Sequence, residues 1–103
     1  MNNSIFVDIN QIQEIMNKNE IIIDLRDSIE YDQLHIKGSI NIPYEEFYNH
    51  KSTLKKDQPI YLICYSGNKS KSLALELRNE GYEAYSFQGG FYTLTHQINN
   101  SYY

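Results

Sequence analysis

The chain contains a single cysteine, Cys64, which opens a loop of small and polar residues. The loop reads Cys-Tyr-Ser-Gly-Asn-Lys-Ser over residues 64–70 and follows directly on the apolar run 60–63. In strand–loop–helix sites of this kind, the main-chain N–H groups of the loop can surround an anion. The positive end of a helix beginning near Ser70 and the ammonium group of Lys69 would both favour a thiolate over a thiol. These residue types, in this order, predict a nucleophilic cysteine.

A lone cysteine at the end of an apolar strand also has a simpler interpretation. Free cysteines are among the most buried side chains and pack as small hydrophobic residues. Core packing alone, however, requires neither Gly67 in the loop nor the cation of Lys69 at the mouth of a helix. The loop therefore favours the chemical interpretation over the packing one.

The strands that must position this loop are indicated by the hydrophobic pattern. Residues 21–25, which are apolar except for Asp24, and residues 60–63 are runs rich in isoleucine, which is typical of central parallel strands covered on both faces. Shorter strands are expected at residues 5–7, 40–42 and 82–87.

Helical patterns lie between these strands. Isoleucines at helical spacing predict a first helix from residue 9 to about 19, and Asp27 with Glu30 matches a capping box for a short helix to about residue 34. A third helix is expected over residues 70–80, ending before Gly81. Further helical turns are expected at 44–48 and from 91 to the C-terminus, with a polar loop over 53–59.

Strands that alternate with helices at this spacing predict one α/β domain over residues 1–103. Its architecture is a three-layer α/β/α sandwich with a mostly parallel central sheet of about five strands. Ligands of such sheets bind beyond the carboxyl ends of the strands. Three polar features fall there, at residues 24–26, 64–70 and 89–90, and their convergence predicts a site.

Composition limits the kinds of partner that the protein is expected to bind and the cellular compartment in which it is expected. The formal net charge of −4 argues against nucleic-acid binding, and no apolar run approaches the roughly 20 residues that span a membrane. No secretory signal is visible at the N-terminus, and one unpaired cysteine suits the reducing cytoplasm. Ten tyrosines among many Asn, Ile and Lys residues are typical of an A/T-rich bacterial gene.

Taken in order, the motifs resemble those of the single-domain rhodanese family. The first block is Asp24-Leu25-Arg26 with Glu30-Tyr31, followed by His-Ile-Lys-Gly-Ser-Ile-Asn-Ile-Pro over residues 35–43. It is similar to the family's Asp-x-Arg and Gly-His-Ile-x-Gly-Ala-x-Asn-Ile-Pro. The loop at residues 64–70 is similar to Cys-x-x-Gly-x-Arg-Ser, and Gly89-Gly90 completes a set that covers nearly the whole chain.

The resemblance implies a sulfurtransferase. A donor such as thiosulfate or a persulfide would deliver one sulfur atom to the catalytic Cys64, and cyanide or a thiol would remove it. The N–H groups of residues 65–70 would hold the developing and persulfide anions, and Lys69 would attract the anionic donor. Tyr65 would form one wall of the pocket mouth, and the hydroxyl of Ser70 would cap the following helix. The expected substrate-binding residues are Arg26, Tyr65, Ser66, Gly67, Asn68, Lys69 and Ser70.

The chain departs from the family pattern at four points. Lys69 stands where the family has arginine, and a lysine lacks the planar fork that grips an oxyanion, which puts thiosulfate in doubt as the physiological donor. Leu34 replaces a glycine and Ser39 an alanine. The tryptophan that often follows the Gly-Gly pair is absent, with Phe91 or Tyr92 as substitutes.

Other polar residues are assigned to the scaffold. Asp24 and Arg26 are expected to pair and hold loops, although Arg26 can still direct its charge toward an anionic donor. His35 is expected to hold the turn after the second helix, with His50 and His96 on the surface. One cysteine and three scattered histidines lack the spacing of a zinc site, so we expect no metal and no other cofactor.

Three alternatives remain open. A phosphatase or arsenate reductase would need Cys-x5-Arg, but Ser70 lies six positions after Cys64 and Lys69 comes one residue too early. The domain could be a non-catalytic rhodanese-like binding module. It could also be a persulfide carrier for a sulfur-relay partner protein, because no second cysteine is present to release the sulfur as a disulfide.

Overall fold

The computed structural model describes residues 4–97 and 103, and it contains a parallel sheet with strand order β1-β5-β4-β2-β3. Every neighbouring pair of these strands is parallel. The strands of the described residues are β1 (Phe6–Val7), β2 (Ile21–Asp24), β3 (Ile40–Asn41), β4 (Ile60–Ile63) and β5 (Ala84–Phe87). The predicted α/β fold with a five-stranded parallel sheet is therefore confirmed.

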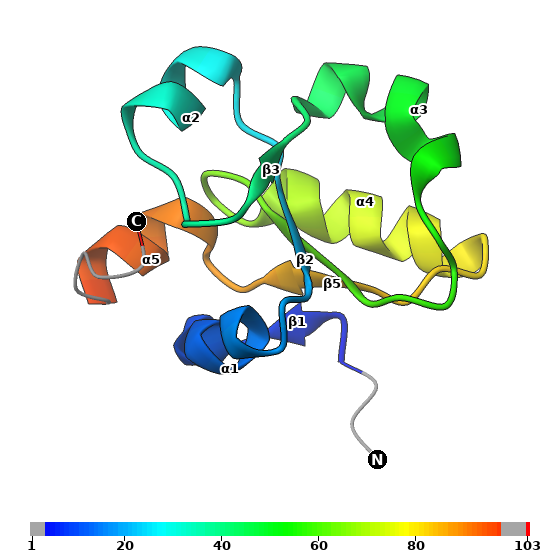
Figure 1. Ribbon diagram of the computed structural model, residues 1–103, viewed down its shortest axis with the longest axis horizontal. Coiled ribbons are helices and arrows are strands. Elements are labelled where there is room, and N and C mark those ends of the chain that lie inside the picture. The colour runs from blue at the N-terminus through cyan, green and yellow to red at the C-terminus, as the bar shows by residue number, and fades with distance from the viewer. Residues whose placement is uncertain (1–3, 98–102) are drawn as a thin grey trace.

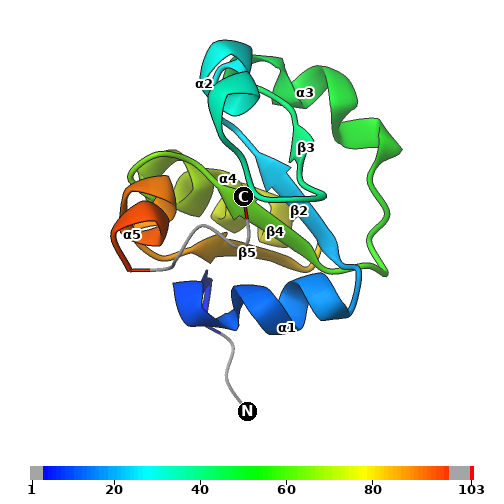
Figure 2. The ribbon, with the colours of Figure 1, turned by 60° about the vertical axis from the view of Figure 1, so that its left-hand side comes forward.

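Helices lie on both faces of this sheet (Figures 1 and 2). One face carries α1 (Ile12–Asn17), which a 3₁₀ turn at Ile9–Gln11 precedes, and α5 (Gly90–Gln97). The other face carries α3 (Phe47–His50) and α4 (Asn68–Asn79). The short α2 (Ser28–Gln33) follows β2, and 3₁₀ turns at Tyr44–Glu46 and Lys51–Thr53 flank α3.

Alternating side chains of the central strands divide the core in two. Ile22 and Ile63 pack with the residues of α1 and α5, whereas Ile23 and Leu62 pack with those of α3 and α4. This arrangement explains the apolar runs over residues 21–23 of β2 and 60–63 of β4, because both faces of a central parallel strand are buried.

Several boundaries differ from those expected from the sequence. The first helix begins as a 3₁₀ turn and ends at Asn17, and Asn19 takes a left-handed φ of 54°. The last strand begins at Ala84 rather than at residue 82. The most consequential difference is that α4 begins at Asn68, two residues before the expected start at Ser70. The expected continuation of the last helix to the C-terminus falls on residues 98–102, outside the described part.

The parallel topology brings the ends of the central strands together at one edge. Beyond the strands, the N–H group of Leu25 donates to the carbonyl of Ile63 at 2.8 Å, and that of Phe91 donates to the carbonyl of Cys64 at 2.8 Å. The segments after β2, β4 and β5 therefore meet. No helix of the described chain has the length and apolar character needed to cross a membrane.

Candidate active site

The sulfur atom of Cys64 lies within a turn of main-chain amides. Its Sγ accepts hydrogen bonds from the N–H groups of Gly67 at 3.2 Å and Ser70 at 3.3 Å. Gly67 has a φ of +97°, in the left-handed region that favours glycine, and it occupies the N-cap position of α4. The loop can therefore curl back toward the sulfur because this position is glycine.

The sulfur also takes over a capping role at α4. The N-cap residue of a helix normally accepts a hydrogen bond from the N–H group two or three positions on. Gly67 has no side chain to do so, and the Sγ of Cys64 accepts the N–H of Ser70, the third residue of the helix. The positive end of a twelve-residue helix therefore points at the sulfur, where it stabilises negative charge.

Ser70 plays a different part from the one expected. It lies inside α4 and does not cap the helix with its hydroxyl. Its Oγ lies 3.4 Å from the Sγ of Cys64, donates to the carbonyl of Gly67 at 3.2 Å, and lies 2.6 Å from the Oγ of Ser86. Both serines are fully buried. Ser86, on β5, is thus a polar neighbour of the site that no sequence motif singles out.

A cavity of about 370 Å³ opens beside Cys64. The cysteine side chain is only 4% exposed and also belongs to the core cluster under α4, so it has a packing role as well. It nevertheless contributes to the cavity wall, and its sulfur is not sealed in the interior. The wall is formed by Leu25, Arg26, Asp27, Glu30, Glu45, Cys64, Tyr65, Ser66, Asn68 and Lys69.

The side chains of the loop line the mouth of this cavity. Tyr65 and Lys69 are exposed, and the Nζ of Lys69 lies 5.2 Å from the ring centroid of Tyr44. None of the three ion pairs found among the described residues involves Lys69. Its charge is therefore available at the mouth, close to the sulfur-bearing turn.

Arg26 reaches the cavity but is held by other groups. Its guanidinium forms an ion pair with the fully buried Asp24, with Nη2 and Oδ2 2.9 Å apart. It also donates to the carbonyl of Leu34 at 2.5 Å and stacks over the ring of Phe91 at 3.7 Å. The expected pairing with Asp24 is present. Phe91, one of the two aromatic residues that follow the Gly-Gly pair, packs against Arg26.

Gly90 closes the site from the side of β5. A Cβ atom at this residue would lie 2.4 Å from the carbonyl oxygen of Cys64 and 2.7 Å from the nitrogen of Gly67. Its φ is +61°, again in the left-handed region. Only glycine lets α5 begin this close to the loop backbone, where the N–H of Phe91 then bonds the carbonyl of Cys64.

The histidines lie away from the sulfur. His35 stacks on Tyr31, with ring centroids 3.8 Å apart, and its Nδ1 lies 2.6 Å from the carbonyl oxygen of Tyr31. His50 and His96 are exposed. Within residues 4–97 and 103, no group of three or more His, Cys, Asp or Glu side chains is placed to hold a metal ion.

The structure thus brings every site residue expected from the sequence to one place. Six of them line the cavity, and Gly67 and Ser70 reach the sulfur through their N–H groups. Sequence reasoning misses Ser86 and the carboxylates of Asp27, Glu30 and Glu45. The spacing of Asp27 and Glu30 indicates only a helix-capping pair, and nothing local distinguishes Glu45.

Comparison with known proteins places this geometry in a family. A family model described as "Rhodanese-like domain" matches residues 8–96. The thiosulfate sulfurtransferase GlpE of Haemophilus influenzae is 33% identical over 82 residues, which cover 79% of this chain and 78% of that protein. A tRNA sulfurtransferase of Desulfurococcus amylolyticus is 41% identical over 70 residues, 68% of this chain but 14% of that protein.

A solved structure agrees over most of the chain. The rhodanese-related protein of Thermoplasma volcanium superposes with a TM-score of 0.80 and 25% identity, covering 92% of this chain and 94% of that one. The chain belongs to the rhodanese-like domain family, and its curated relatives include sulfurtransferases.

Proposed function

We propose that this protein is a sulfurtransferase that carries sulfane sulfur as a persulfide on Cys64. The proposal rests on one observation above the rest: the Sγ of Cys64 accepts two main-chain N–H groups at the wall of a cavity. Donors fixed in the backbone need no reorganisation when negative charge develops, which is the arrangement that stabilises anionic transition states.

The reaction has two balanced steps. The Cys64 thiolate attacks the outer sulfur of a donor such as thiosulfate, so that a new S–S bond forms while the donor's S–S bond breaks and sulfite leaves with the electron pair. The persulfide anion on Cys64 then gives its outer sulfur to cyanide or to a thiol, and the thiolate is regenerated. Covalent catalysis of this kind divides one difficult transfer into two easier steps.

The surrounding residues take supporting roles in this proposal. The N–H groups of Gly67 and Ser70 hold the thiolate and the persulfide, Lys69 attracts an anionic donor and steadies the departing sulfite, and Tyr65, Ser66 and Asn68 shape the mouth. Arg26 forms part of the cavity wall, and Asp24 neutralises most of its charge. The single unpaired cysteine suits a reducing compartment such as the cytoplasm.

A relay to a partner protein is a variant of the same proposal. The sequence has no second cysteine that could release the sulfur by forming a disulfide, so the acceptor must be an external thiol, cyanide or a partner. A carrier would turn over slowly with thiosulfate but would accept sulfur quickly from a dedicated donor protein.

Intact-mass spectrometry tests the proposal directly. Protein incubated with thiosulfate or a small persulfide should gain the mass of one sulfur atom, and added cyanide or glutathione should remove it. Cys64→Ser should gain nothing, because a serine hydroxyl cannot form the persulfide. If several sulfane donors leave the wild-type mass unchanged, the protein is a non-catalytic binding module instead.

A further inference from the structure

The cavity beside Cys64 has an acidic wall. Asp27 and Glu30 reach it from α2 and its N-cap, and Glu45 reaches it from the turn at Tyr44–Glu46. All three residues are exposed, and none of the ion pairs of the described chain involves them. The side chain of Asp27 accepts the N–H of Glu30 as the cap of α2, so Glu30 and Glu45 are the carboxylates free to meet a ligand.

The cations of the wall do not balance these carboxylates. Arg26 is neutralised by the buried Asp24, because its guanidinium donates to both carboxylate oxygens of that residue. Lys69 is then left against three acidic side chains around the same cavity. An entering dianion such as thiosulfate would meet net repulsion over the wall, with local attraction only beside Lys69.

The cavity is also larger than a single transferred sulfur needs. Its volume of about 370 Å³ falls within the range of about 300–1,000 Å³ that is common for small-molecule sites. The part of the donor that carries the sulfur can therefore lie inside, beside Glu30 and Glu45. A positive charge on that carrier would be attracted where a negative one is repelled.

We propose that Glu30 and Glu45 select sulfur donors whose persulfide is carried by a cationic group, and that they disfavour dianionic donors such as thiosulfate. The inference rests on the proposed function of Cys64. The Cys64 thiolate attacks the outer sulfur of the donor R–S–SH, the new S–S bond forms as the donor's S–S bond breaks, and R–S⁻ leaves. The ammonium or guanidinium group of R remains paired with the acidic wall. Such a donor is either a free aminothiol persulfide or a cysteine persulfide flanked by Lys or Arg in a polypeptide.

The test uses two persulfides of the same chain length and opposite charge. Because their leaving thiols also differ in pKa, each loading rate is divided by the rate at which the same persulfide transfers its sulfur to a free thiol. Cysteamine persulfide bears an ammonium group, whereas mercaptopropionate persulfide bears a carboxylate on a chain of the same length. We expect Cys64 to be loaded about tenfold faster by the first at low salt, since each exposed charge contact contributes about threefold. Added salt should reduce the preference, because the screening length falls to about 8 Å at physiological ionic strength. Loading is followed by intact mass.

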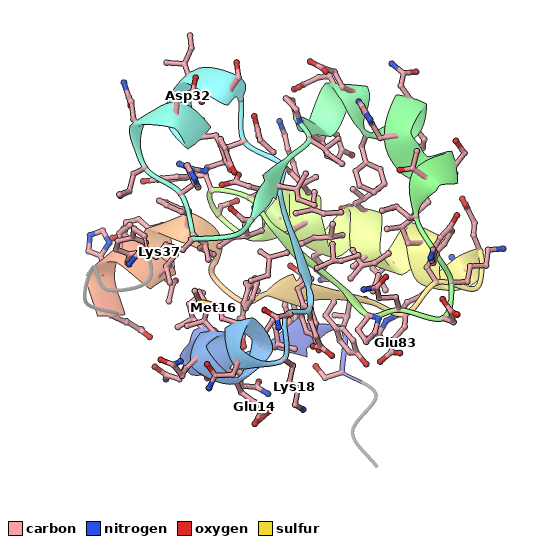
Figure 3. The ribbon with its side chains drawn as sticks, in the orientation of Figure 1. Glu14, Met16, Lys18, Asp32, Lys37 and Glu83 are labelled. Atoms are coloured by element: carbon pink, nitrogen blue, oxygen red, sulfur yellow. The ribbon has the colours of Figure 1, made fainter. Side chains whose placement is uncertain are left out.

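A pair of double variants supplies the control. Glu30→Gln/Glu45→Gln should remove most of the preference and should accelerate loading from thiosulfate. Glu14→Gln/Glu83→Gln makes the same change in net charge outside the cavity wall and should keep the preference. Figure 3 labels both control residues, Glu14 on the outer side of α1 and Glu83 before β5. Thermal unfolding of each variant verifies that it is folded.

The outcomes separate the two proposals. Equal loading by the two persulfides, faster loading by the anionic one, or a preference unchanged in Glu30→Gln/Glu45→Gln overturns the inference while Cys64 still accepts sulfur. Failure of every donor to load Cys64 overturns the proposed function, and this inference with it. A Lys-Cys-Lys peptide persulfide completes the series: faster loading by the peptide than by cysteamine persulfide supports a protein donor, and slower loading supports a free aminothiol.

Discussion

The hydroxyl oxygens of Ser70 and Ser86 lie 2.6 Å apart behind the sulfur of Cys64, and both side chains are fully buried. One residue belongs to α4 and the other to β5, so this hydrogen bond fixes the start of the helix against the sheet. It also orients the Ser70 hydroxyl, which lies 3.4 Å from the Cys64 sulfur and accepts from its thiol. This hydroxyl donates to the thiolate only if its proton turns away from the carbonyl of Gly67.

Removal of the Ser70 hydroxyl should therefore slow persulfide loading more than removal of the Ser86 hydroxyl. Ser70→Ala deletes a group in contact with the sulfur and should slow persulfide loading about tenfold, the effect of one hydrogen bond to a charged atom. Ser86→Ala should slow loading less but should lower the free energy of unfolding by about 1 kcal/mol. Ser72→Ala, on the exposed side of α4, is the control and should change neither quantity. A normal loading rate for Ser70→Ala would mean that the amides alone hold the anion.

The cation at the mouth should control the response to thiosulfate. Lys69→Ala should lower kcat/KM with thiosulfate about threefold, the usual size of an exposed charge contact, and Lys69→Arg should raise it because a guanidinium can grip two oxygens of the donor. Steady-state thiocyanate production provides the measurement. Lys71→Ala is the matched control, because the Nζ of Lys71 lies over the ring of Phe6 and not at the cavity. A flat response to both Lys69 substitutions would remove this residue from the mechanism.

Gly90 should be intolerant of any side chain. In Gly90→Ala the new Cβ would lie 2.4 Å from the carbonyl oxygen of Cys64 and 2.6 Å from that of Tyr65, and backbone atoms cannot move aside cheaply. Strain and overpacking together should lower the free energy of unfolding by about 3 kcal/mol and should abolish loading. Urea unfolding followed by tyrosine fluorescence suits this protein, which has ten tyrosines and no tryptophan.

Gly38→Ala separates strain from the clash at Gly90. Gly38 also has a positive φ, +81°, but a Cβ atom added there would have no neighbouring atom within 4 Å. Only the backbone preference is lost at this position, which should cost about 1 kcal/mol. Equal losses for the two glycine substitutions would contradict the close approach of α5 to the loop.

The buried pair of Asp24 and Arg26 should be coupled strongly. Asp24→Asn leaves a guanidinium that is 8% exposed without its carboxylate, and Arg26→Met leaves a fully buried carboxylate unpaired. Each single change should lower the free energy of unfolding by about 3 kcal/mol, as is usual when one partner of a buried pair is removed. The double variant Asp24→Asn/Arg26→Met should lose much less than the sum, and additive losses would show that the two side chains stabilise the fold independently.

The strands and helices follow largely from local patterns. Local patterns are the isoleucine runs of β2 and β4, the stripe of Leu73 and Leu77 on α4, and Gly81 after that helix. Each acts within a few residues, and each of these elements lies within two residues of its expected bounds. The expected start of α4 is wrong by two residues because the Cys64 sulfur, a group outside the helix, supplies its cap. A capping partner of this kind has no signature in the helix sequence itself.

Sequence alone determined the candidate nucleophile and its immediate frame, because Cys64, Gly67 and Ser70 lie within seven consecutive residues, in the loop after β4 and the first turn of α4, and chain connectivity keeps them close together. The tertiary structure decided what surrounds the sulfur. Ser86 reaches Ser70, and Gly90 reaches the backbone of the loop, only because β5 pairs with β4. Glu45 reaches the cavity only because the turn at Tyr44–Glu46 lies beside the end of β2. Distances between residues far apart in the chain depend on strand order and packing, which no local pattern specifies.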